Sequence, residues 1–298
     1  MIERKNTLVL FSKPPVPGLV KTRLTVLKDG RFQPEVASAL YHCMLFDVVE
    51  IICAAFDDLD AEAAEAVEAQ RAAGNADDDI VFDTYELLIS TTPKENVQVM
   101  EDLFAAAGTW PRPLAFTYDE GANFDIHYNM AFDRAWERGA SCILSMGADM
   151  PALTKKDVRA GFHALHQLCD NSDIYPNGGI VLAPDQEMGV SVVGWPCNTH
   201  FDHTGVYYCQ TGLTVLPDYI QKAREAGLPV LYLPPIPDVD TMADLRHNIT
   251  LVEALNYCAE FDDVCPPWRT WNALGEMGLT HVRVMPNDLR DPREGIDK

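Results

Sequence analysis

The stretch from Thr7 to Leu24, TLVLFSKPPVPGLVKTRL, joins a short apolar run to a loop rich in proline. The apolar run, Leu8 to Phe11, is too short for a stable helix and ends at a Pro/Gly cluster, so it predicts a buried strand. Each of the three prolines that follow restricts φ and removes a backbone donor. We therefore expect a strand that leaves the sheet into a stiff loop.

Three cationic side chains lie on this loop, namely Lys13, Lys21 and Arg23. The segment 18–22 ends in Lys-Thr like a Walker motif, but the prolines of this loop lack backbone donors, so backbone amides cannot cradle phosphate along the whole loop. Surface cations are usually just solvated. Their concentration on one turn beyond a strand end favours a binding role instead, because ligands of open α/β sheets bind there.

The composition limits the partners of this protein. The chain has 298 residues, 47% of them hydrophobic, and a net charge of −22. Such a surface repels nucleic acid and anionic membranes, so we expect neither as a partner and favour a small nucleotide met by a cationic pocket or a metal ion. The eight cysteines form no Cys-x-x-Cys pair, which favours reduced thiols. With no expected signal peptide and no apolar run of membrane-spanning length, we expect a cytoplasmic protein.

Strand–loop–helix units repeat along the chain, which predicts an α/β fold with a mostly parallel sheet and helices on both faces. The expected strands span residues 8–11, 85–90, 114–118, 141–146, 179–183, 190–195 and 229–233. The expected helices span residues 34–51, a solvated segment within 57–79, 93–107, 125–138 with Asp125 as N-cap, 155–169, 213–226, 241–260 and 268–277.

Two acidic turns are expected to face the same crevice as the Lys21 loop. Pro151 prevents an early helix start, which holds Asp149 on the turn at the carboxyl end of a central strand. Thr154 and Asp157 then form a capping box. In the segment 237–245, PDVDTMADL, Thr241 and Asp244 are expected to cap a helix and to leave Asp238 or Asp240 facing the crevice. The alternative is that these aspartates serve only as turn and capping residues.

The segment Phe11–Leu24 closely resembles the N-terminal signature of DUF2064, an uncharacterised family of glycosyltransferase-A-like (GT-A-like) proteins with the nucleotide-diphospho-sugar transferase fold. Lys21–Leu24 more distantly resembles a segment of 2-phospho-lactate guanylyltransferases. The turn at Asp149 resembles the family's Gly-x-Asp-x-Pro motif, and residues 238–245 resemble its Asp-x-Asp-Thr-x-x-Asp-Leu motif. The resemblance covers about residues 7–245.

The segment Pro184–Val190 departs from the Asp-Gly-Gly-Tyr pattern of the family. Glu187 stands in place of the aspartate, and Met188 in place of the first glycine, which restricts close approach of the backbone to a ligand. Only Glu187 and Gly189 are therefore carried over to the pocket.

The resemblance implies a GT-A-like nucleotide-binding transferase domain over residues 1–247, followed by a helical C-terminal extension and tail over 248–298. Magnesium prefers oxygen ligands and is usually held by one or two carboxylates plus phosphates, so Asp149 and Asp240 are the expected ligands of Mg²⁺ or Mn²⁺. Lys21, Arg23 and Asp149 are the expected catalytic residues. The expected substrate-binding residues are Phe11, Ser12, Lys13, Pro14, Gly18, Thr22, Gly147, Ala148, Glu187 and Gly189.

These features predict a metal-dependent transferase with a nucleotide-sugar donor and a small-molecule acceptor. One alternative is a nucleotidyltransferase that releases pyrophosphate, and another is a nucleotide-binding protein without catalysis. His200 and His203 are interpreted as polar residues of the pocket rim rather than as a metal pair. The general base stays open among Asp119, His127, Glu187 and His203. The C-terminal extension either packs on the domain or mediates self-association.

Overall fold

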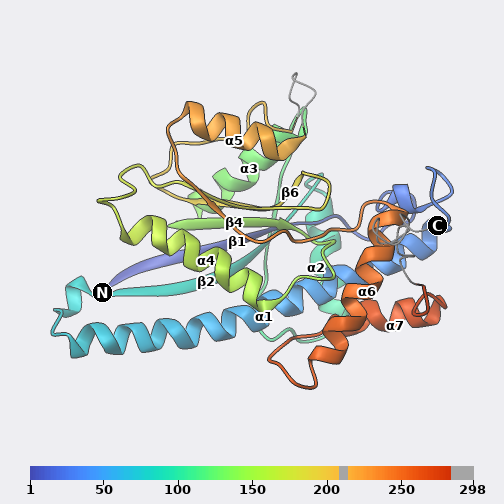
Figure 1. Cartoon of the computed structure of the whole chain (residues 1–298), viewed down its shortest axis with the longest axis horizontal. Helices are drawn as coiled ribbons and strands as arrows, with labels where there is room; N and C mark the ends of the chain where they lie inside the picture. Colours follow the sequence, from blue (N-terminus) through green and yellow to red (C-terminus); the bar gives the residue numbers. More distant parts are fainter. Residues whose placement is uncertain (208–213, 283–298) are drawn as a thin grey trace, which may run out of the picture.

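The structure is a computed structural model of the chain, and it describes residues 1–207 and 214–282 (Figure 1). Cys209, the expected helix start near residue 213 and the expected tail after residue 286 lie outside this range. The seven cysteines within it are free thiols.

Seven strands of the described chain form one sheet in the order β3-β2-β1-β4-β6-β5-β7. Their bounds are β1 Ile2–Phe11, β2 Val81–Thr91, β3 Ala115–Tyr118, β4 Cys142–Gly147, β5 Ile180–Pro184, β6 Val190–Pro196 and β7 Val230–Tyr232. β6 is antiparallel to β4 and β5, and the remaining neighbours are parallel. The predicted mostly parallel sheet is therefore confirmed.

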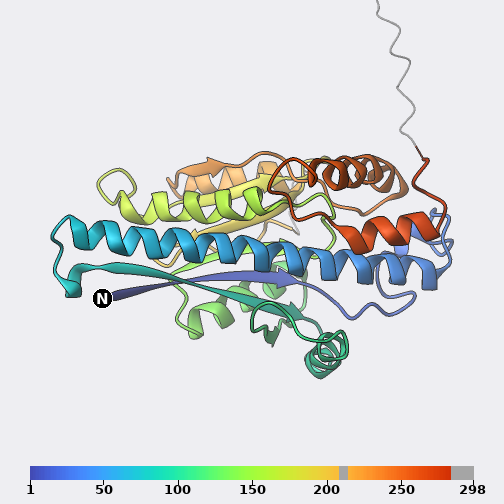
Figure 2. The same cartoon turned by 90° about the horizontal axis from the view of Figure 1, so that it is seen from below.

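Helices cover both faces of this sheet, as predicted. Leu8 and Leu10 of β1 belong to the core shared with α1 and α4, whereas Val9 between them belongs to the core shared with α3 and α5. Figure 2 shows α4 beside α1, and α3 on the other side of β1 and β2. The helices are α1 Pro34–Ala72, α2 Asn96–Ala106, α3 Phe124–Glu137, α4 Lys155–Asp170, α5 Val215–Glu225, α6 Met242–Cys258 and α7 Trp268–Glu276, with short 3₁₀ helices at Thr22–Leu24 (η1) and Asp77–Asp79 (η2).

The longest helix, α1, has 39 residues and corrects two expectations. It includes both segments that were expected as separate helices, because no Gly or Pro interrupts it after Pro34. By length and composition it is also apolar enough to cross a membrane, although no such run was expected. In the window that meets this criterion 72% is buried inside the protein, as in the core helix of a folded domain.

The N-cap of α3 is Asn123 rather than the expected Asp125. The Asn123 side chain accepts a hydrogen bond from the backbone N–H of Ile126 at 3.1 Å. Asp125 is buried, and its carboxylate accepts the backbone N–H groups of Gly205 at 2.9 Å and Tyr207 at 2.7 Å. Asp125 thus anchors a loop distant in sequence, a role that local sequence does not indicate.

Two predicted capping boxes are confirmed. Thr154 and Asp157 cap α4, and Thr241 and Asp244 cap α6, each with the reciprocal bonds of side chain to backbone. Asp240 immediately precedes the second box, and Asp149 lies five residues before Thr154 of the first. The boxes therefore determine where these helices begin and where the preceding aspartates lie.

The C-terminal segment packs on the preceding part of the chain. α6 runs without a break across residues 247 and 248, where the domain boundary was predicted, and α7 lies against α1 (Figure 1). Arg269 pairs with Asp47 of α1 at 3.1 Å and also with Glu50. The backbone N–H of Thr270 donates to Asp47 at 2.7 Å.

Candidate active site

A cavity of about 440 Å³ opens at the edge of the sheet where β1, β2 and β4 end. Its walls come from five segments that are far apart in the sequence. They are the β1 end with its loop (11–13 and 19–21), the ends of β2 and β3 with the start of α3 (90, 92, 119, 124 and 128), the β4 turn (147–150), the β5–β6 turn with the start of β6 (185 and 189–191), and residues 238 and 240 before α6. Tyr41 of α1, Tyr207 and Val215 complete the lining.

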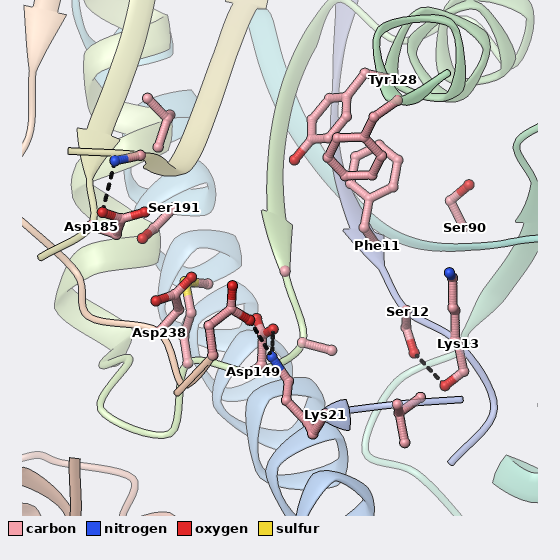
Figure 3. A pocket seen from close by; sticks show the side chains of 18 of the residues that line it. Phe11, Ser12, Lys13, Lys21, Ser90, Tyr128, Asp149, Asp185, Ser191 and Asp238 are labelled. Carbon is pink, nitrogen blue, oxygen red and sulfur yellow. Dashed lines mark hydrogen bonds and ion pairs between the residues drawn. The ribbon is translucent and has the colours of Figure 1, made fainter. Parts of the chain in front are cut away.

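One end of this cavity, which we call the charged end, consists of Lys21, Asp149, Asp238 and Asp240. The ammonium of Lys21 binds the Asp149 carboxylate and also lies 2.9 Å from Asp240 Oδ1 (Figure 3). Arg23 binds the second oxygen of Asp240 at 2.9 Å, with its own side chain largely exposed. The two expected metal ligands therefore converge, but each is already paired with a cation of the first loop.

Burial and neighbouring charges have opposite effects on the pKa values of Lys21 and Asp240, and they act in the same direction on Asp238. Burial alone lowers the pKa of Lys21, but the charges of Asp149 and Asp240 outweigh it, so this pKa lies above its usual value. Burial opposes ionisation of Asp240, yet Lys21 and Arg23 hold its pKa below the usual range. Burial and the charge of Asp149 raise the pKa of Asp238 to about 7.

Local backbone geometry places these groups. Lys21 has φ 46° and ψ 39°, a left-handed conformation that non-glycine residues rarely adopt, and it immediately precedes η1. A Cβ at position 147 would lie 2.6 Å from Asp149 Oδ1, so Gly147 leaves room for that carboxylate. The charged end thus combines one residue in a strained conformation with a glycine that lets Asp149 keep its present position.

The opposite wall, which we call the aromatic end, consists of Phe11, Phe124, Tyr128 and Tyr207. The rings of Phe11 and Tyr128 stack with centroids 4.1 Å apart, and Tyr128 stacks on Tyr207 at 4.7 Å. Phe124 meets Tyr128 edge-on at 5.0 Å. In Figure 3, Phe11 and Tyr128 lie away from the Lys21–Asp149 pair, which leaves the two ends of the cavity distinct.

A hydrogen-bonded trio lies beside the aromatic end. Asp119 is 3% exposed, and its carboxylate accepts the Ser90 hydroxyl at 2.6 Å. Its other oxygen lies 2.7 Å from Nδ1 of His127. Asp119 and Ser90 line the cavity, whereas His127 supports Asp119 from α3. These two bonds fix the orientation of the carboxylate.

The turn between β5 and β6 differs from its expected form. Glu187 is exposed and does not line the cavity, whereas Asp185 does. Asp185 Oδ1 accepts the backbone N–H groups of Glu187 at 2.6 Å and Gly189 at 2.8 Å. Met188 has φ 66°, the left-handed region that the glycine of the family pattern adopts without strain. The structure therefore places Asp185 where Glu187 was expected.

The residues expected at the site divide into two groups. Nine line the cavity, namely Phe11, Ser12, Lys13, Lys21, Gly147, Ala148, Asp149, Gly189 and Asp240. Five are not among the lining residues, namely Pro14, Gly18, Thr22, Arg23 and Glu187. Six lining residues were not expected from the sequence, namely Tyr41, Ser90, Tyr128, Asp185, Ser191 and Tyr207. Their residue types are equally typical of a core, a turn or a strand, so the sequence did not distinguish them.

Of the four residues considered as general base, only Asp119 is among the lining residues of the cavity, and Glu187, His203 and His127 are not. Glu187 is exposed, and His203 is fully buried with Nδ1 bound to the Tyr219 hydroxyl at 2.7 Å. Burial lowers the pKa of His203 to about 3. His200 is exposed, so His203 and His200 do not share one environment. Asp119 lines the cavity, and His127 contacts it through the hydrogen bond to the Asp119 carboxylate.

The donor set at the charged end suits a cation that brings most of its own ligands. Within residues 1–207 and 214–282, no group of three or more His, Cys, Asp or Glu side chains is arranged to hold a metal ion. Asp149 and Asp240 nevertheless meet at one cationic atom, the Lys21 ammonium. Magnesium keeps several waters and commonly takes only one or two carboxylates plus phosphate oxygens. The pair fits that mode of binding.

The arrangement of strands and helices is that of the nucleotide-diphospho-sugar transferase fold. A proposed nucleotide-diphospho-sugar transferase from Desulfovibrio desulfuricans is similar with a TM-score of 0.64 and 20% identity, covering 94% of this chain and 99% of that chain. A 4-diphosphocytidyl-2C-methyl-D-erythritol synthase from Anaerococcus prevotii has a TM-score of 0.41 and 11% identity over 85% and 96% of the two chains. A cytidylyltransferase from Leptospira borgpetersenii has a TM-score of 0.40 and 10% identity over 95% and 98%.

A family model also matches part of the sequence. Residues 82–208 match the model of the family described as "Uncharacterized protein conserved in bacteria (DUF2064)". This match confirms the resemblance to DUF2064 and includes the Asp149 turn, while the Lys21 loop and residues 238–245 lie outside it. No curated protein matches the chain.

Proposed function

We propose that this protein is a metal-dependent transferase that moves a glycosyl group from a nucleotide-sugar donor to a small acceptor. The observation that carries the proposal is the convergence of Asp149 and Asp240 on one cation position inside a cavity at the carboxyl edge of the sheet. A nucleotide diphosphate needs its charge neutralised, and the protein as a whole is strongly acidic. The charged end combines cations and metal-binding carboxylates where such a ligand can be held.

The residues of the charged end have separate roles in this proposal. Asp149 and Asp240 would hold Mg²⁺ or Mn²⁺, which when bound stabilises the charge of the departing diphosphate. Lys21 and Lys13 would bind phosphate oxygens from the protein side. Arg23, at the exposed margin, keeps Asp240 ionised and oriented. Asp185 and Ser191, across the cavity from Lys13, would bind sugar or acceptor hydroxyls.

The choice of glycosyl transfer rests on a proton acceptor in the cavity. A hydroxyl nucleophile must lose a proton as it attacks the anomeric carbon, whereas the phosphate nucleophile of nucleotidyl transfer is already ionised. The buried Asp119 carboxylate can take that proton, and His127 beside it can stabilise either charge state by hydrogen bonding. The alternative of nucleotidyl transfer is motivated by the same charged end and does not use Asp119 as a base.

The test is to incubate the protein with sugar nucleotides and, separately, with nucleoside triphosphates, each with Mg²⁺, Mn²⁺ or a chelator. Glycosyl transfer, or the hydrolysis that accompanies it without an acceptor, releases a nucleoside diphosphate. Nucleotidyl transfer releases pyrophosphate. We expect nucleoside diphosphate, and only with metal present.

Two outcomes would overturn the proposal. Pyrophosphate release from a triphosphate would establish the nucleotidyltransferase alternative. Thermal stabilisation by a sugar nucleotide without turnover across a panel of hydroxyl acceptors would favour a nucleotide-binding protein without catalysis. Glu187→Gln serves as the control variant for both assays, because this side chain is exposed outside the cavity lining.

A further inference from the structure

Lys21 has an unusual position for a phosphate-binding lysine. Its side chain is 7% exposed, and its ammonium contacts two carboxylates from different turns, Asp149 and Asp240. In this geometry the ammonium stands at the point where the two expected metal ligands converge. A divalent cation shared by these carboxylates therefore needs the space and the oxygen atoms that Lys21 occupies.

The surrounding charges show what an exchange of cations would achieve. Asp238 lies in the same cavity and adds a third carboxylate. Lys21 contributes one positive charge against this group, whereas a divalent ion contributes two. The charged end with Lys21 in place is therefore still short of positive charge, which favours a metal once Lys21 has another partner.

The backbone of Lys21 adds a second, independent observation. The residue has φ 46°, so it is held in a left-handed conformation at the start of η1. A non-glycine residue persists in that region when its surroundings over-determine it, and such strain concentrates at switch regions and ligand clamps. Lys21 thus combines the paired ammonium with a backbone conformation of the kind found at such regions.

We propose that Lys21 is an internal counter-cation that occupies the metal position in the nucleotide-free protein, and that a divalent cation displaces its ammonium into the cavity to bind phosphate. The proposal rests on the function proposed above. It adds that the empty protein disfavours free metal, so that metal and phosphate bind together. The metal and Lys21 thus compete before the substrate arrives and act side by side afterwards.

The first test measures Mn²⁺ binding to the nucleotide-free protein by calorimetry or by the electron paramagnetic resonance of free Mn²⁺. Lys21→Met removes the competing charge and keeps an unbranched side chain of similar length. We expect it to bind Mn²⁺ at least about tenfold more tightly than the wild type, which corresponds to about 1.4 kcal/mol. Adding Asp149→Asn to Lys21→Met should abolish the gain, because the metal loses a ligand.

Lys13→Met is the matched control. It removes the same charge from the same cavity, yet within the described chain the Lys13 ammonium forms no ion pair with a carboxylate. We expect its Mn²⁺ affinity to change less than about threefold, because unpaired charges at a distance are screened by solvent and salt. Equal gains in both variants would mean a general electrostatic effect and would overturn the competition.

A second measurement uses the wild-type protein and needs no folded variant. Acetic anhydride labelling followed by mass spectrometry reports how accessible each lysine is. Saturating Mn²⁺ should raise the labelling of Lys21 about tenfold or more relative to an equal concentration of NaCl, while the labelling of Lys13 stays nearly constant. Unchanged protection of Lys21, or no Mn²⁺ binding by any variant, would refute the proposal. Neither assay depends on turnover, so failure of the transferase assay alone would leave the competition standing.

Discussion

The two ends of the cavity are built in different ways. At the charged end, each important side chain lies in or beside a short local motif: Lys21 at the end of a proline-rich loop, and Asp149 and Asp240 on turns before capped helices. At the aromatic end, Phe11 and Tyr128 come from β1 and α3 and meet only because the chain folds back. A charged residue at a predicted turn indicates a binding site from the sequence alone, whereas an aromatic residue is equally typical of a buried core.

The two ends also differ in what their removal should do. The charged end carries the groups that bind metal and phosphate, so its variants should affect catalysis most. The aromatic end and the helices behind it bury neutral titratable groups, so its variants should change stability with pH. The following predictions compare the ends, starting with the largest expected effect.

Asp149→Asn should lower metal-dependent turnover by about 1000-fold, because the asparagine removes a metal ligand and the charge that holds it. Steady-state kinetics with saturating Mg²⁺ measures the loss, and circular dichroism checks that the fold is intact. If metal-dependent nucleotide binding is unchanged in this variant, Asp149 is not a ligand.

Asp119→Asn should lower kcat by about 100-fold while KM for the nucleotide changes little, because asparagine keeps the shape and the Ser90 bond but cannot accept a proton. Ser90→Ala is the companion variant and should have a smaller effect, since it leaves the carboxylate in place. An undiminished kcat in Asp119→Asn would remove the argument for a hydroxyl acceptor.

His203→Gln should remove much of the acid sensitivity of folding. The pKa of His203 is about 3 in the folded protein against an ordinary value of 6.5, so the unfolded chain binds the proton more tightly. Stability is then fully present above pH 6.5 and falls as the pH drops toward 3, by about 2–4 kcal/mol near pH 4. Urea unfolding at pH 7 and pH 4 measures how much the free energy of unfolding falls between these pH values. An equal fall in the variant and the wild type would contradict the prediction.

Asp238→Asn should have the opposite pH signature at the charged end. Burial and Asp149 raise the pKa of Asp238 to about 7 from an ordinary 3.8, so the folded state binds the proton more tightly. The contribution of Asp238 to the stability of the folded state is therefore present below pH 3.8 and is lost as the pH rises to 7. The variant should gain about 1 kcal/mol relative to wild type at pH 8, a modest value because the group is partly exposed. Urea unfolding in the presence of a chelator measures this gain, and a variant that is less stable than wild type at pH 8 would show that the carboxylate is held favourably.

Glu187→Gln should change kcat/KM by less than about twofold. Its side chain is exposed, and Asp185 takes the cavity position that the family pattern assigns to this turn. The matched change Asp185→Asn should be clearly larger, because its Oδ1 holds the turn through the N–H groups of residues 187 and 189. A larger effect for Glu187 than for Asp185 would restore the expectation from the family pattern.

The parts of the site that were predictable share a physical property. Asp149 follows an apolar run and precedes a proline, and Asp240 precedes a capping box, so the end of the preceding element and the start of the next helix were both readable. Parallel strands bring their carboxyl ends to one edge, which allowed the convergence of these turns with Lys21 to be expected. That Lys21 would bind both carboxylates was not expected, because pairing depends on side-chain distances.

The predictions that were wrong followed local patterns that the folded chain overrides. Asp125 looked like a helix cap, but it binds the backbone of residues 205 and 207, which approach only in the folded chain. Glu187 was expected in the pocket because the turn was aligned by pattern, whereas in the structure Asp185 lines the cavity and Glu187 is exposed. The continuous α1 was divided because its composition changes midway, although no breaker interrupts it.

Local sequence determined the order of strands and helices, the stiff first loop, the two capped turns and the excess of acidic charge, because each depends on neighbours along the chain. Only the tertiary structure decided that the Lys21 ammonium lies between Asp149 and Asp240, that Asp119 is oriented by Ser90 and His127, and that aromatic rings form the far wall. These contacts join residues far apart in sequence, and their distances arise from the register and packing of the whole sheet.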